Sequence, residues 1–156
     1  MELTKDMLLK MNACTPGFDW FNRQNETDVG KLIQLAIDNL DDDAFSYANW
    51  GIPRLLGKTN KIRYAVFAAE QVLPHFAEKH PDDDRPRKAI EAAKAVIEDD
   101  SEENRKRTAD AAYAAAYAAD AAAYAAADAA CAAEDKKKEV QKQILEYGKS
   151  LLIGNK

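Results

Sequence analysis

The sequence predicts an all-α protein: a compact multi-helix bundle with a long alanine-rich C-terminal helix or helical hairpin. Three observations predict this fold class. Apolar residues recur at helical spacing in most segments, for example over 29–40. Alternating β-branched runs are absent, and the six glycines leave little material for hairpin turns. Alanine, the best helix former, fills eighteen of the 25 positions from 109 to 133.

Five helices are expected before the alanine-rich stretch, and each has a recognisable start or stop. They span residues 5–11, 28–40, 44–56, 61–79 and 88–97. Thr4, Thr27 and Ser101 stand at expected N-caps, because a hydroxyl there accepts a hydrogen bond from a free backbone N–H. Pro53 and Pro74 lie within two of the helices and predict bends, because proline has no N–H to continue the ladder.

A turn-rich break is expected at residues 12–17, and three aromatic rings follow it at Phe18, Trp20 and Phe21. Two interpretations of this cluster are open. The rings plug one end of a helical core, where aromatic side chains bury a large area, or they form an aromatic binding platform. The first interpretation is favoured because it is the commoner use of such clusters.

The whole chain, 1–156, is expected to form a single all-helical domain with three parts. These are the N-terminal helices over 1–57, a helical pair over 58–100, and the alanine-rich and C-terminal helices over 101–153. A length of 156 residues is enough to bury a core in one domain.

Charge and targeting signals restrict the location and the partners. The net charge of −5 argues against nucleic acid or an anionic membrane as a direct partner. No apolar run is long enough to span a bilayer, and the N-terminus lacks the pattern of a secretory signal. We therefore expect a cytoplasmic protein in which Cys14 and Cys131 are free thiols.

No catalytic, metal or cofactor site is predicted. The sequence contains no nucleophile elbow, zinc-protease, P-loop or dinucleotide-binding pattern. His75 and His80 are five residues apart, so a helix places them on different faces, and neither has another ligand at metal-binding spacing. These observations argue against an enzyme.

The alanine-rich stretch carries a stripe of larger residues. Its predicted partner-binding residues are Asp110, Tyr113, Tyr117, Asp120, Tyr124 and Asp128. Their steps of three and four residues keep them on one side of a helix, within a stripe roughly 80° wide. Tyrosine is enriched in binding hot spots, and the carboxylates would select a basic protein partner.

The orientation of this tyrosine–aspartate stripe depends on residues 134–139. If they are helical, a stripe formed by Val140, Ile144, Tyr147 and Leu151 falls opposite the tyrosines. That apolar stripe would face the core and leave the tyrosines outside. If the helix breaks there, the alternative is open that the tyrosines lie in the core.

One segment resembles a known family. Residues Asn49 to Ala95, and most specifically VLPHFAEKHPDDDRPRKAIEAA at Val72 to Ala93, resemble bacterial immunity proteins of polymorphic-toxin loci, which are also phage-associated. The opening ACTPGFDWF, Ala13 to Phe21, is similar to an ACxxGxxWF start found on various bacterial and phage proteins. The resemblance implies an all-helical protein that binds and blocks another protein in a bacterial cell or a phage-infected host.

The sequence thus predicts a non-enzymatic inhibitor that blocks a toxin or nuclease through an acidic, tyrosine-bearing helical surface. Two alternatives are open. One is a phage-encoded, anti-CRISPR-like inhibitor of a host nuclease effector. The other is a structural module that dimerises through the alanine face, so a homodimer is possible.

Overall fold

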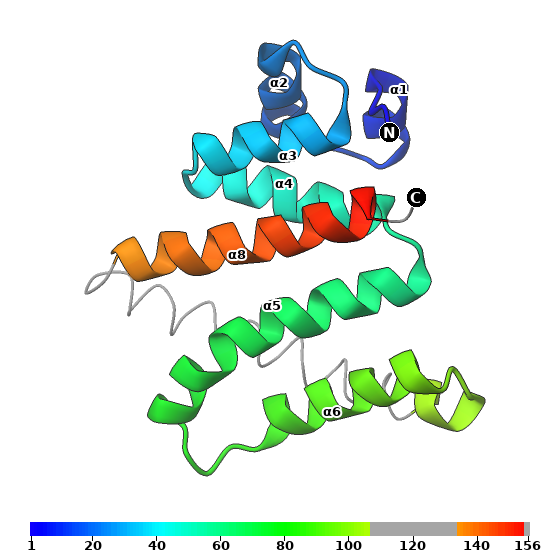
Figure 1. Ribbon diagram of the computed structural model, residues 1–156, viewed down its shortest axis with the longest axis vertical. Coiled ribbons are helices and arrows are strands. Elements are labelled where there is room, and N and C mark those ends of the chain that lie inside the picture. Colours follow the sequence, from blue (N-terminus) through cyan, green and yellow to red (C-terminus); the bar gives the residue numbers. More distant parts are fainter. Residues whose placement is uncertain (107–133, 155–156) are drawn as a thin grey trace. The chain divides into compact units, whose positions relative to one another are not determined.

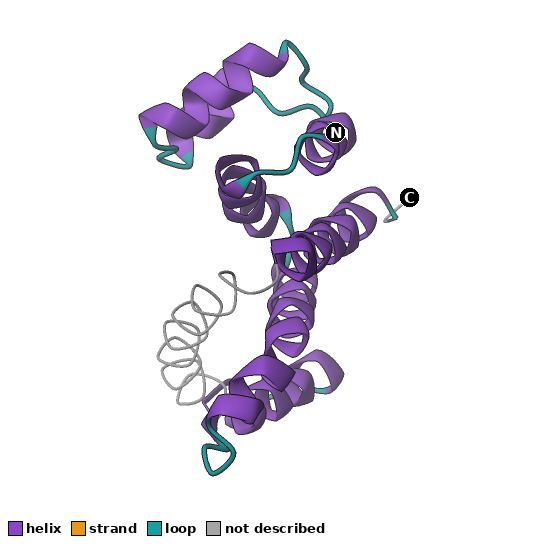
Figure 2. Ribbon diagram, turned by 90° about the vertical axis from the view of Figure 1, so that its left-hand side faces the viewer, coloured by secondary structure: helices purple, strands orange, loops and turns teal. Residues whose placement is uncertain are grey.

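The protein is all-α, as the sequence predicted. The computed structural model describes residues 1–106 and 134–154, in which helices are joined by short connections (Figures 1 and 2). The helices are α1 Lys5–Lys10, α2 Thr15–Gln24, α3 Val29–Asp38, α4 Asp42–Leu55, α5 Lys58–Lys79, α6 Arg85–Glu98 and α8 Glu134–Ile153. In these described ranges the only extended pairing is an isolated antiparallel bridge between Glu2 and Asp28.

The chain divides into two compact units. Unit 1 comprises Met1–Gly57 with Gln141–Lys156, and unit 2 comprises Lys58–Val140. The boundary falls within α8, so unit 1 is built from two stretches of chain that are far apart in the sequence.

The core of unit 1 forms where α3 packs on α4 and the C-terminal part of α8 lies beside them (Figure 1). Ala36 and Leu145 are completely buried there, and Ile52 is 2% exposed. Side-chain hydrogen bonds join α8 to α4 and α3. The Gln141 amide donates to the Asp42 carboxylate at 3.3 Å, and the Lys149 ammonium donates to the side-chain oxygen of Gln34 at 2.6 Å.

Helix α2 begins inside the segment that the sequence predicted to be a break. Its first residue is Thr15, and Pro16 lies in its first turn, where the missing N–H costs nothing. The helix ends at Asn25, whose φ of 49° is left-handed, a conformation that asparagine tolerates. Phe21 on this helix joins Leu8 and Leu32 in a buried cluster.

Two of the three predicted N-caps are confirmed. The hydroxyl of Thr4 accepts from the backbone N–H of Met7, and that of Ser101 accepts from Asn104 at 3.4 Å. Thr27 was the wrong residue: Asp28 caps α3 instead. The Thr27 hydroxyl instead donates a hydrogen bond to the carboxylate of Glu2.

In unit 2, α5 packs against α6. The residues buried between and around them are Tyr64, Val66, Phe76, Pro86, Ala89, Ile90 and Val96. Burial raises the pKa of the Tyr64 hydroxyl, because the ionised form would lose its hydration. Helix α5 continues through Pro74, and α4 continues through Pro53.

Residues 134–139 are helical, since α8 begins at Glu134. The buried face of α8 shares only Ile144 with the stripe that the sequence predicted. Ile144 is 5% exposed, whereas Val140, Tyr147 and Leu151 are half-buried. The other buried residues are Gln141, Leu145 and Gly148. At about 100° per residue, this turns the buried face by roughly 80° from the predicted stripe. The orientation of the tyrosine–aspartate stripe therefore stays a prediction.

Candidate functional site

The six predicted partner-binding residues lie outside the described residues. They are Asp110, Tyr113, Tyr117, Asp120, Tyr124 and Asp128, all within 107–133. Cys131 lies in the same stretch, whereas Cys14 is a free, exposed thiol. Two features of the described part are candidates for function: the charged turn between α5 and α6, and an apolar pocket in unit 1.

The charged turn begins where α5 ends. The backbone N–H of His80 still bonds to Phe76, and that of Asp83 closes the turn by bonding back to His80 at 3.1 Å. The Asp83 carboxylate then accepts from the Arg85 backbone at 3.1 Å and from its guanidinium at 2.6 and 2.8 Å. Asp84, the N-cap residue of α6, makes no capping bond and pairs with Lys88 at 2.7 Å.

These contacts lower the pKa values of two aspartates in and beside the hairpin formed by α5 and α6. Hydrogen bonds from the Arg85 guanidinium lower the pKa of Asp83 to about 2. At the hairpin's other end, Asp100 accepts from Arg105 at 2.7 Å and from Lys58 at 2.9 Å, and its pKa also falls to about 2. Both aspartates are therefore ionised at neutral pH and already engaged.

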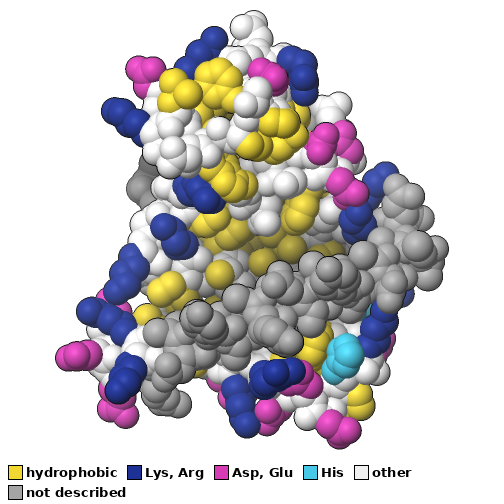
Figure 3. Space-filling model, turned by 180° about the vertical axis from the view of Figure 1, so that it is seen from behind, with side chains coloured by type: hydrophobic (Ala, Val, Ile, Leu, Met, Phe, Trp, Pro, Cys, Tyr) yellow, Lys and Arg dark blue, Asp and Glu magenta, His cyan; other side chains and the backbone are white. Residues whose placement is uncertain are grey.

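A further ion pair, from Lys94 to Glu70 at 2.6 Å, joins α6 to α5. Over residues 58–106, eleven acidic side chains stand against ten basic ones. Figure 3 shows acidic and basic side chains next to one another at several places on the surface. The sequence motif HPDDDRPR thus forms a largely self-neutralised turn, not an acidic surface.

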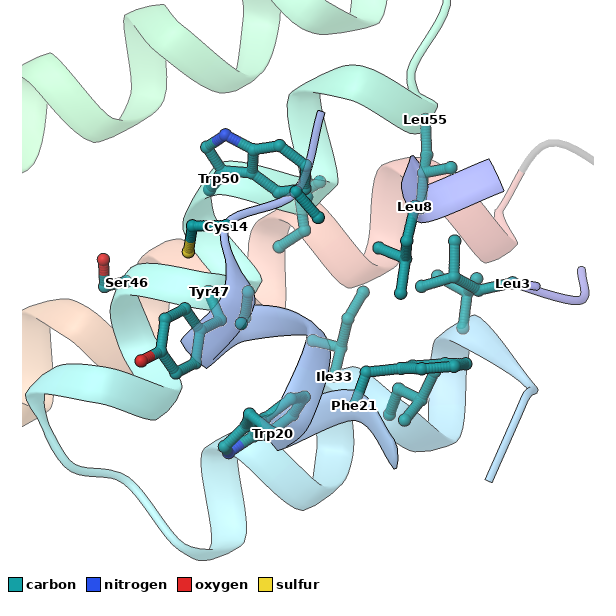
Figure 4. A pocket seen from close by; sticks show the side chains of 17 residues that line it. Leu3, Leu8, Cys14, Trp20, Phe21, Ile33, Ser46, Tyr47, Trp50 and Leu55 are labelled. Carbon is teal, nitrogen blue, oxygen red and sulfur yellow. The ribbon is translucent and has the colours of Figure 1, made fainter. Parts of the chain in front are cut away.

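The second feature is a pocket of about 150 Å³ within unit 1 (Figure 4). Its lining is mostly apolar and comes from the N-terminal segment, α2, α3 and α4. The lining residues that carry large apolar or aromatic side chains are Leu3, Leu8, Trp20, Phe21, Val29, Leu32, Ile33, Tyr47, Trp50, Ile52 and Leu55.

The pocket has a buried aliphatic side and an aromatic rim. Leu8, Ile33 and Ile52 are each buried, whereas the indoles of Trp20 and Trp50 are half-buried. The Trp20 ring lies 6.2 Å from the ring of Tyr47 at an interplanar angle of 50°. The Arg54 guanidinium stacks 4.1 Å over the Trp50 ring, a cation–π contact that holds this indole in its orientation.

Small residues explain why space remains between these rings. Ala13, Gly17, Ala48 and Gly51 also line the pocket. At Gly17, an added Cβ would lie 3.1 Å from the Tyr47 ring, so glycine permits a close approach of α2 to α4. At Gly51, an added Cβ would meet nothing within 4 Å, so this wall is open.

The polar groups of the pocket lie at its edge. Cys14 and Ser46 are exposed. Partial burial raises the pKa of the Tyr47 hydroxyl, and the nearby carboxylates of Asp43 and Asp41 raise it further, while Arg23 opposes them. The edge therefore has charges of both signs nearby, with Asp41 and Asp43 on one side and Arg23 and Arg54 on the other.

Sequence reasoning missed this pocket, because its walls come from four segments that only the fold brings together. The aromatic cluster gave a partial signal. Phe21 takes the predicted core role, while Trp20 forms part of the pocket wall. The ACTPGFDWF segment also carries small residues beside its aromatic ones. In the sequence, Gly17 lies between Cys14 and the three rings.

No group of three or more histidine, cysteine or acidic side chains in residues 1–106 and 134–154 is arranged to hold a metal ion. Among the helices described, none has the length and apolar character needed to cross a membrane.

Comparison with known proteins gives one match. A family model described as “Imm-5 like putative immunity protein” matches residues 55–134, which is just over half of the chain. The matched segment contains α5, α6 and the alanine-rich stretch. No curated protein and no solved structure matches the chain.

Proposed function

Because the chain belongs to the Imm-5-like family of immunity proteins, we propose that it binds a toxin protein and blocks its action. The single observation that carries this proposal is the family match over 55–134. An inhibitor of this kind needs a recognition surface and no catalytic groups, which agrees with the absence of catalytic motifs from the sequence.

The charge distribution supports a binding surface in the second half of the matched segment. Residues 55–134 contain fifteen acidic and eleven basic side chains. In the α5–α6 hairpin the two signs nearly balance, and several of the charges pair with one another. The excess of negative charge belongs to residues 107–134, which have four acidic side chains and one basic side chain.

We propose that the tyrosine–aspartate stripe of this segment contacts a basic surface of the toxin. Tyr113, Tyr117 and Tyr124 would supply large contact area, since tyrosine is enriched among hot spots. Asp110, Asp120 and Asp128 would speed the encounter by attracting a basic partner, an effect that salt weakens. This proposal comes from the spacing of the residues in the sequence.

The test is neutralisation of a candidate toxin taken from the genes that neighbour this one. A bacterial host is made to express that toxin with or without the protein, and its growth is measured. Wild type should restore growth and form a complex with the toxin in size-exclusion chromatography. If growth is not restored, the immunity function is wrong for this toxin. Inhibition of a host defence nuclease instead would favour the anti-defence alternative.

Three sets of substitutions test whether the tyrosine–aspartate stripe is the surface that binds the toxin. Replacing Tyr113, Tyr117 and Tyr124 together by alanine should abolish the complex with little change in melting temperature. Replacing Asp110, Asp120 and Asp128 by asparagine should slow association about tenfold at low salt. The matched control replaces the exposed Asp6, Asp19 and Asp38 by asparagine and should leave association unchanged.

The proposal about the stripe and the proposal of an immunity function can be refuted separately. Full binding by both stripe variants would overturn the stripe and leave the immunity function standing. A large fall in the melting temperature of the tyrosine variant would place the tyrosines in the core.

A further inference from the structure

Both tryptophans of the chain, Trp20 and Trp50, line the apolar pocket of unit 1. Among the described residues that line the pocket, all belong to unit 1, and Leu55 alone falls within the segment that the family model matches. A toxin-binding surface at residues 107–134 would therefore not account for this pocket.

The volume of the pocket defines the size of what it can hold. A cavity of about 150 Å³ lined by leucine, isoleucine and phenylalanine accepts benzene and stays dry when empty. The pocket has this volume and the same kinds of buried side chain, including Leu8, Phe21 and Ile33. Water would find few hydrogen-bond partners inside it.

The chemistry of the lining defines the class of ligand. In Figure 4 the hydroxyls of Ser46 and Tyr47 and the indole nitrogen of Trp50 point away from the middle of the pocket. A charged ligand would lose its hydration there without gaining a partner. Rings from Trp20 and Phe21 offer edge and face contacts that favour another aromatic ring.

We propose that this pocket binds a small uncharged molecule built on one aromatic ring, of the size of benzene or toluene. The proposal does not depend on the immunity function, because it uses only residues of unit 1.

Tryptophan fluorescence gives a direct readout, because the only two indoles of the chain line the pocket. Titration of the full chain with toluene should give a saturable fluorescence change. At ten times the dissociation constant, toluene should raise the melting temperature by about 3–5 °C. Benzoate, a charged ring of similar size, should cause neither effect. Without a saturable change up to the solubility limit of toluene, the proposal is wrong.

A filling variant tests whether toluene occupies the pocket. Ala48→Leu places a larger side chain in the wall and should weaken toluene binding at least tenfold. The matched control is Ala65→Leu, at an exposed position of α5, which should bind like wild type. If Ala48→Leu does not fold, the smaller Ala48→Val at the same lining position serves instead. Wild-type affinity in a folded filling variant overturns the proposal.

The thiol of Cys14 provides a second, independent measurement. Its sulfur lies at the pocket between Tyr47 and Trp50 (Figure 4). In a Cys131→Ser background, saturating toluene should slow the alkylation of Cys14 by N-ethylmaleimide, whereas benzoate should not. An unchanged rate, in a sample whose fluorescence shows saturation, would place toluene elsewhere and contradict the assignment to this pocket.

Discussion

The α5–α6 turn and the pocket of unit 1 differ in how readily their residues are recognised in the sequence. In the turn, the acidic run stands out in the sequence, yet Asp83 binds Arg85 and Asp84 binds Lys88. In the pocket, the wall depends on inconspicuous residues such as Ala48 and Gly51, whose small size leaves about 150 Å³ between aromatic rings. Runs of charge are readily neutralised by neighbours in sequence, whereas a cavity requires residues from several elements.

The largest expected effect tests the claim that unit 1 is held by its core. Leu145→Ala removes a completely buried side chain from α8 and should lower the free energy of unfolding by about 3 kcal/mol. Denaturation in urea measures this loss. Leu9→Ala, at a side chain that is 62% exposed, is the control and should cost under about 0.5 kcal/mol. Similar losses in the two variants would contradict the placement of α8.

A pair of glycine substitutions sharpens the contrast between the tight and open walls of the pocket. Gly51→Ala should stabilise by about 0.5–1 kcal/mol, because alanine favours the helix and its Cβ meets nothing within 4 Å. Gly17→Ala should give less stability than Gly51→Ala by about 1 kcal/mol or more, because its Cβ would lie 3.1 Å from the Tyr47 ring and offset the same helix preference. Thermal unfolding of both variants measures the difference, and an equal or larger stabilisation by Gly17→Ala would refute this description of the pocket.

The smallest expected effect concerns the paired aspartates of unit 2. The pKa of Asp83 and of Asp100 is about 2 when folded, against 3.8 for a free side chain. Their stabilisation is therefore present above pH 3.8 and is lost as the pH falls toward 2. The Asp83→Asn, Asp100→Asn variant should show a shallower fall in melting temperature from pH 4 to 2 than wild type. Because both pairs are exposed, added salt should reduce the difference.

Local rules were enough to predict much of the fold. The helical class and the caps at Thr4 and Ser101 follow from short-range chemistry. Helix α2 was missed because its first turn contains Pro16 and Gly17, which also signal a turn. Only the packing of α2 against α4 and the N-terminal cluster favours the helix.

Non-local contacts account for the features that the sequence could not predict. Thr27 lost the cap of α3 to Asp28 because a contact with Glu2, 25 residues away, engages its hydroxyl. Likewise, the buried face of α8 centres on Leu145 because the partners of Gln141 and Lys149 lie on α3 and α4. The pocket is the extreme case, since four segments contribute to it. The stripe of residues 110–128 lies outside the described residues, so its role stays a prediction.

The two-part construction of unit 1 has a consequence for how the protein is made. The contacts from Gln141 to Asp42 and from Lys149 to Gln34 join residues 99 and 115 positions apart. Long closures of this kind are entropically costly and form slowly. On the ribosome, α3 and α4 emerge early but must wait for nearly the whole chain before α8 can cover them. Until then, their apolar faces are exposed, and the nascent protein is most vulnerable to aggregation or chaperone capture in that interval.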